Sequence, residues 1–238
     1  MSGRCHRKKS WNDRGNDMGT ISKSEKDKRK FIYFIFPFLI ICFFVFQGCA
    51  NSGKPRYDVE NSLLSYTAPA FENKTKLDKT IRISRFTIAA AYNNQNMIFR
   101  TNDYNIDFFN YNRWAVNPAD MTADILLRDM QESGLFLAVF SRYAVEETRF
   151  LIQGGINDFF LRIEDKSKVA VIAIEITLKD SQQKEATKKI VFQKKYSREE
   201  TLTDQSPHGY CQAMSKALKN LSQQITTDVY AALKASAN

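Results

Sequence analysis

TRFLIQGGINDFFLRIEDKSKVAVIAIEITLKD, residues 148–180, forms the centre of the predicted sheet. Two runs rich in β-branched and aromatic residues flank the polar segment EDKSK at 164–168, which predicts two long strands joined by a turn. Five apolar residues of the second run share one face by alternation: Ala170, Ile172, Ile174, Ile176 and Leu178. The other face begins apolar and turns polar at Glu175, so we expect a central strand.

Further strands are predicted on both sides of this stretch. They occupy residues 57–66, 80–88, 134–143 and 186–202, the last with the basic residues of an exposed or edge strand. Alternation in the second of these suggests an irregularity near Ser84. Residues 96–102 and 104–112 predict a hairpin whose turn contains Asn102 and Asp103, because Asn and Asp tolerate turn conformations.

Two helices are predicted, each with its own start signal. In the first, Asn117 suits the N-cap, Pro118 the first helical position and Gly134 the C-terminal stop. The second begins at Ser206-Pro207 and runs toward Leu233, with an apolar stripe that we expect to pack on the sheet. The order of elements predicts an α/β protein of the α+β type, in which two main helices pack on a single sheet, either mixed or antiparallel.

The N-terminal part of the chain has the pattern of a secretory signal. Residues 1–30 are polar and basic, with ten Lys or Arg against four Asp or Glu, and we expect them to be disordered; Met18 is a possible true start. FIYFIFPFLIICFFVF, residues 31–46, follows without a charge, and the hydrophobic segment extends to residue 48. As a helix this run would reach about 24 Å, short of the ~30 Å hydrocarbon layer.

Gly48-Cys49 closes the hydrophobic segment and resembles the lipobox of bacterial lipoproteins, in which diacylglycerol is attached to the Cys that becomes the first mature residue. The match is incomplete, because Phe46 and Gln47 stand where a Leu and a small residue are usual. We expect Cys49 to be lipidated and residues 49–55 to form a flexible tether. The alternative is an uncleaved signal anchor, because length alone does not exclude a short span. The folded domain is predicted over residues 56–235.

Charge and motifs argue against several classes of function. Residues 1–30 carry +6 of the formal net charge of +9, which leaves about +3 on the mature chain and no basic stripe for a nucleic-acid partner. His208 is the single His of the mature domain, Cys211 is an isolated Cys expected to be a small buried residue, and no spacing of ligands predicts a metal or other cofactor. Gly154-Gly155 lacks the rest of a phosphate loop and suggests a bulge or turn. We therefore do not expect an enzyme.

The order of elements over roughly residues 56–234, with Tyr92 in a turn, Arg100 in the hairpin and Trp114 just before the first helix, resembles the ABC-type transport auxiliary lipoproteins. The resemblance implies an association with an MCE-family protein and with the permease and ATPase of an ABC lipid transporter. It also implies docking of that assembly at the outer membrane from the periplasmic side. Ala50 is not the Asp that usually retains lipoproteins on the inner membrane. The alternative is an envelope lipoprotein that scaffolds or activates a cell-wall synthase or an outer-membrane assembly complex.

Three aromatic residues of the hairpin region are predicted at an interface. Alternation that places Ile98, Ile106 and Phe108 on the inner face leaves Phe109 and Tyr111 on the other, where they would meet an MCE partner or a second copy of the chain. Trp114 is either core packing or a surface anchor.

Overall fold

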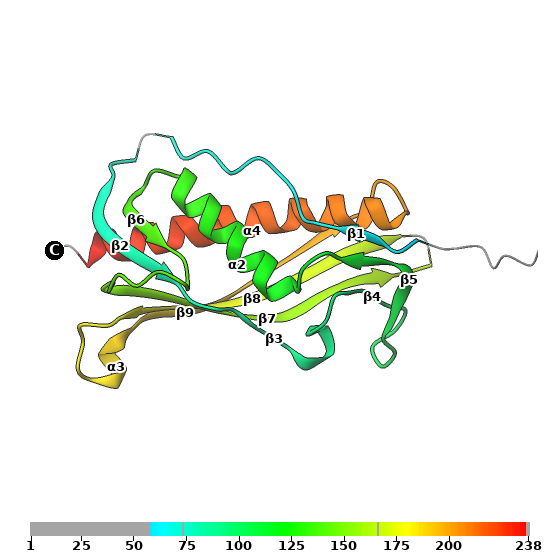
Figure 1. Ribbon diagram of the computed structural model, residues 1–238, viewed down its shortest axis with the longest axis horizontal. Helices are drawn as coiled ribbons and strands as arrows, with labels where there is room; N and C mark the ends of the chain where they lie inside the picture. The colour runs from blue at the N-terminus through cyan, green and yellow to red at the C-terminus, as the bar shows by residue number, and fades with distance from the viewer. Residues whose placement is uncertain (1–57, 73, 166, 237–238) are drawn as a thin grey trace, which may run out of the picture. The chain divides into compact units, whose positions relative to one another are not determined.

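The central hairpin confirms the prediction drawn from residues 148–180. The structure is a computed structural model that describes residues 58–72, 74–165 and 167–236 (Figure 1). In it, β7 (Phe150–Ile163) and β8 (Lys168–Asp180) pair antiparallel along their whole length, from Phe150 opposite Asp180 to Ile163 opposite Lys168. All five residues predicted on one face of β8 are fully buried.

Three short strands pair, one after another, with the edge of β7 that lies opposite β8. β2 (Leu77–Ile83), β3 (Thr87–Ile88) and β4 (Asn96–Arg100) each pair with it in parallel, so that β7 is contacted from its first residues to its last. Parallel and antiparallel pairs thus coexist, and of the two predicted arrangements the sheet is the mixed one. The break between β2 and β3 falls at Ser84–Phe86, at the irregularity expected near Ser84.

The remaining strands extend this sheet at its borders. β6 (Phe136–Phe140) lies parallel to β2, and β9 (Ile190–Thr201) lies antiparallel to β8. β5 (Asp107–Trp114) pairs antiparallel with β4, which confirms the predicted hairpin, and β1 (Glu60–Ser62) lies parallel to β5. Over the described residues the nine strands form a single curled sheet.

Two long helices cover one side of the sheet (Figure 1). α2 (Pro118–Glu132) starts as predicted, with the Asn117 side chain accepting a hydrogen bond from the Ala119 amide at 2.9 Å. Gly134 follows its end with a φ of 65°, a conformation that glycine adopts without steric cost. α4 (Pro207–Ala235) begins after Ser206, whose hydroxyl accepts from the Gly209 amide, and packs on β8 and β9.

The core lies between these helices and the sheet. At its centre the Trp114 indole meets the rings of Phe159 and Tyr210 edge-on, at centroid distances of 5.5 and 5.4 Å. Residues 63–72, after β1, cross the outer side of the helices (Figure 1), where the Tyr66 hydroxyl donates to the buried carboxylate of Asp129 at 2.7 Å. The helices are therefore held from both sides.

Several local predictions were wrong in detail. The strand expected at 57–66 is only the three residues of β1, and the strand expected from residue 186 begins at Ile190, after the short helix α3 (Ala186–Lys189). Gly154 and Gly155 lie inside β7, and the bulge comes just after them, between Ile156 and Asp158. Gly154 is needed for packing, because a Cβ there would lie 2.5 Å from the Phe86 ring.

The predictions for residues 1–30, 31–48 and 49–55, including Cys49, lie outside the described residues. Within the described part of the chain, no helix has the length and hydropathy needed to cross a membrane. All described residues belong to one compact unit of the chain.

Candidate functional site

Trp114 is a core residue and not a surface anchor. Its side chain is 1% exposed, and at the last position of β5 its indole packs against Phe159 and Tyr210. Of the two roles considered for it, core packing is the one that the structure supports. The interface hypothesis for Trp114 therefore does not hold, since a partner cannot reach this side chain.

The alternation assumed for the hairpin is also wrong at its far end. Phe109 is half-buried and its ring lies 5.2 Å from that of Phe99, whereas Phe108 and Ile106, both expected inside, are exposed. Beyond this point the register is irregular. Ile98 pairs with Phe108 but Asn96 pairs with Arg113, so extra residues of β5 between Phe108 and Arg113 interrupt the alternation. Ile98 is buried, as predicted, and Tyr111 is 47% exposed.

Three exposed side chains thus define a surface that we call the hairpin tip: Tyr104, Ile106 and Phe108, with exposed fractions of 95%, 50% and 45%. Local hydrogen bonds hold the loop that carries them. The Asn102 carboxamide oxygen accepts from the Tyr104 and Asn105 amides, both at 2.9 Å, and the Arg100 guanidinium donates to the Asp103 carbonyl. The tip is therefore an ordered surface with aromatic and aliphatic groups in solvent, a composition typical of recognition surfaces.

Strand register places the hairpin tip at the end of the domain where the described chain begins. β1 runs parallel to β5 with Glu60 opposite Asn112, so the chain before β1 approaches along β5 from the direction of the tip. The end of β4 is aligned with the end of β7, Arg100 opposite Arg162, which brings the turn between β7 and β8 to the same end. The right-hand side of Figure 1 shows this end.

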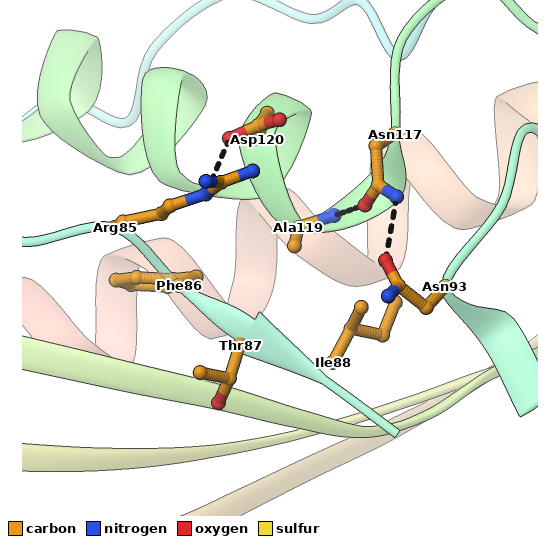
Figure 2. Close-up of a pocket in the computed structure, with 8 residues that line it drawn as sticks. All are labelled: Arg85, Phe86, Thr87, Ile88, Asn93, Asn117, Ala119 and Asp120. Atoms are coloured by element: carbon orange, nitrogen blue, oxygen red, sulfur yellow. Dashed lines mark hydrogen bonds and ion pairs between the residues drawn. The ribbon is translucent and has the colours of Figure 1, made fainter. Parts of the chain in front are cut away.

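A cavity of about 380 Å³ lies elsewhere, between the start of α2 and the segment that joins β2 to β4 (Figure 2). Two amides form one side of it, with Asn117 Nδ2 donating to Asn93 Oδ1 at 3.0 Å (Figure 2). On the other side, Arg85 reaches toward Asp120 of α2, with 3.9 Å between Nε and Oδ1. Arg85 and Asp120 also line a second, larger cleft of about 550 Å³ together with Arg82 and Arg142.

The residues considered for chemistry are not assembled into a site. His208 is exposed and hydrogen-bonded to Gln212, while Cys211 is buried, as predicted, and burial raises the pKa of its thiol. A high thiol pKa lowers the fraction of reactive thiolate. Among the described residues no group of His, Cys, Asp and Glu has the arrangement of a metal site.

An ordered hairpin with exposed aromatic residues, in a domain that also carries clefts lined by amides and arginines, is typical of a binding domain. The sequence then places the chain in a family, because the model of the ABC-type transport auxiliary lipoprotein component matches residues 63–226. The protein belongs to this family and is an auxiliary lipoprotein of ABC-type transport systems. It is accordingly a lipid-anchored protein of the cell envelope, and its family is not a known enzyme family.

Solved structures share the fold at low sequence identity. A crystal structure of a Xanthomonas campestris protein has a TM-score of 0.66 and 12% identity, with 74% of this chain and 98% of that chain covered. A crystal structure of an uncharacterized protein has a TM-score of 0.55 and 10% identity, with 68% and 99% covered. No curated protein has a significantly similar sequence. At these identities the likeness concerns the fold alone.

Proposed function

We propose that this protein is the periplasmic lipoprotein of an MCE-type ABC lipid-transport system, and that it docks the transport assembly at the outer membrane. The observation that carries the proposal is the family match over residues 63–226, most of the folded domain. An auxiliary component needs an anchor and a surface for its partner, and the chain offers a candidate for each.

The proposed anchor is Cys49, which follows a basic segment, a charge-free apolar run and Gly48. Two or three acyl chains attach a protein stably to a bilayer, whereas one binds only marginally. Eight residues lie between Cys49 and Asp58, the first described residue, and the nine steps from one to the other span at most about 32 Å when fully extended. The end of the domain that carries the hairpin tip would therefore remain close to the membrane surface.

The proposed partner surface is the hairpin tip. Tyr104 and Phe108 supply aromatic area with few rotatable bonds, and the Asn102 turn orders their loop before any partner binds. An MCE-family protein is the occupant that the family assignment favours, and a second copy of the chain is the competing outcome. Tyr104, Ile106 and Phe108 take the place of Phe109 and Trp114 in the interface predicted from the sequence, and Tyr111, which is 47% exposed, remains a proposed member of it.

Affinity purification of the chain from its own envelope tests the proposal. We expect the MCE-family protein, the permease and the ATPase to co-purify from detergent-solubilised membranes. Recovery of a cell-wall synthase or an outer-membrane assembly complex in their place would contradict it.

The anchor has a separate prediction. Mass spectrometry of the mature protein should find Cys49 as an acylated first residue, and Cys49→Ser should leave the chain unprocessed or released from the membrane. Cys211→Ser is the matched control and should be processed normally, because Cys211 is buried inside the folded domain. An unmodified Cys49 in the mature wild-type protein would rule out this anchor.

A further inference from the structure

We propose that the cleft of about 550 Å³ between the β2–β3 segment and the loop after β6 binds a phosphate group, and we call it the arginine cleft. Arg82, Arg85 and Arg142 line it, and they come from β2, from the link to β3 and from the loop after β6. Asp120 of α2 is the one carboxylate among its lining residues. The inference concerns the ligand of the proposed transport component and rests on that function for its biological meaning.

Arg142 is already neutralised and serves as a wall of the cleft. Its guanidinium lies 3.2 Å from Asp120 Oδ1 and 3.1 Å from Asp124 Oδ1, and it stacks over the Tyr143 ring at 4.6 Å. With two carboxylates from α2 and an aromatic face as partners, Arg142 fixes the loop after β6 to the start of α2. Asp120 and Asp124 thus compensate Arg142, and little negative charge is left near the cleft for its other arginines.

Arg82 has no such compensation. It lies in β2, beside Phe140 of β6 and Leu151 of β7, and it forms no ion pair with any described residue. Its Nε and Nη2 atoms are buried without a hydrogen-bond partner in the described part of the chain. The side chain as a whole is half-buried, so its charge is only partly solvated and lacks a carboxylate partner among the described residues. An anion in the cleft, next to the accessible part of the guanidinium, would supply the missing counter-charge.

Arg85 can complete the site from the solvent side. Its side chain is 78% exposed and its Nε lies 3.9 Å from Asp120 Oδ1, a loose contact with a carboxylate that Arg142 holds more closely. Figure 2 shows the Arg85 side chain extending toward Asp120 of α2, and Arg85 lines both cavities. Arg85 therefore has its donors available for a ligand that also reaches Arg82.

The chemistry of these groups favours phosphate. A guanidinium offers parallel N–H donors whose spacing matches two oxygens of a phosphate, and two arginines on opposite sides can bind different oxygens of one group. The cleft has the volume of a small-molecule site, and Leu151 and Tyr143 add apolar contacts beside the arginines. Both a phospholipid headgroup and a free phosphate would provide the same group.

Isothermal titration calorimetry on the purified full-length chain in a neutral detergent tests the site. The probes are inorganic phosphate and dihexanoyl phosphatidylglycerol, a soluble phospholipid. We expect saturable binding of at least one probe, weakened tenfold or more by Arg82→Gln and by Arg85→Gln. Arg198→Gln, at an exposed arginine of β9 outside the cleft, is the control and should bind as the wild type does.

The two probes identify the source of the phosphate. Phospholipid binding at least tenfold tighter than phosphate, with phosphate as a competitor, assigns the cleft to a lipid headgroup, and equal affinities assign it to free phosphate. Absence of saturable binding of both probes, or unchanged binding in Arg85→Gln, overturns the proposal. Arg85→Gln alters an exposed side chain and keeps the test valid if Arg82→Gln does not fold. Since the measurement needs no partner protein, its failure is distinguishable from failure of the docking function.

Discussion

The central hairpin β7–β8 and the outer hairpin β4–β5 follow the same sequence pattern and obey it to different degrees. In β8, alternate residues from Ala170 to Leu178 are fully buried. In β5 the predicted faces are reversed at two adjacent aromatic residues, with Phe109 half-buried and Phe108 exposed. β8 has a strand along each side and a helix over it, whereas β5 pairs with β4 in an irregular register and with β1 only at Asn112–Trp114. The strand with neighbours along its whole length keeps the predicted faces, and the strand with partial neighbours does not.

The largest effect is expected where the outer hairpin joins the core. Trp114→Ala should lower the free energy of unfolding by about 3–5 kcal/mol, because it removes a large side chain packed between Phe159 and Tyr210. Phe108→Ala in the same strand should change it by less than about 0.5 kcal/mol. Urea unfolding followed by circular dichroism measures both. Equal losses of unfolding free energy in the two variants would contradict the assignment of Trp114 to the core and of Phe108 to the surface.

The central hairpin should be intolerant of added volume at one glycine and tolerant at the next. An alanine Cβ at Gly154 would meet the buried Phe86 ring at 2.5 Å, so Gly154→Ala should cost about 1–3 kcal/mol. At Gly155 the nearest atom is the Thr87 hydroxyl at 3.3 Å, and Gly155→Ala should cost less than about 1 kcal/mol. The difference in urea midpoint between the two variants measures this difference in stability. A Gly154→Ala protein as stable as the wild type would mean that Phe86 can move aside.

The sequence correctly predicted those elements that several independent signals specify at once. The caps at Asn117 and Ser206, the stop at Gly134 and the buried face of β8 were all predicted, because capping, composition and periodicity agree there. The parallel strands along β7 were not predicted in their arrangement, since pairing between distant segments leaves no local pattern. The exposed position of Phe108 was missed for a related reason. Which face of β5 is covered, and the register shift between Phe108 and Arg113, both depend on pairing with other segments, and the residues of β5 alone do not indicate either.

A pH-dependent contribution is expected at the open end of the central hairpin. Arg149 donates to both carboxylate oxygens of Asp180, with Nη2 2.8 Å from Oδ2, and these hydrogen bonds hold the pKa of Asp180 below its usual value. A lowered folded-state pKa stabilises the protein above the unfolded pKa of about 4, and the contribution is lost as pH falls through the folded value.

Asp180→Asn should therefore cost about 1–2 kcal/mol at pH 7. The difference from the wild type should shrink as the pH falls below about 4. Urea unfolding at pH 7 and pH 3 tests the prediction. Asp78→Asn, at an exposed carboxylate on β2, is the control and should show little difference at either pH. A difference for Asp180→Asn that stays constant between the two pH values would contradict the role of its charge.

The smallest effect on stability should accompany the largest effect on assembly, at the hairpin tip. The double variant Tyr104→Ser/Phe108→Ser is the direct test of the account, with Leu137→Ser, an exposed leucine of β6 that is 52% exposed, as the matched control. The measurement is quantitative co-purification of the MCE-family protein, with the urea midpoint and the molar mass in solution recorded on the same samples. We predict that the double variant keeps its urea midpoint and loses the partner, while Leu137→Ser retains both. Undiminished recovery of the partner with a folded double variant, or loss of a homo-oligomer in its place, would contradict the assignment of this surface to an MCE-family protein.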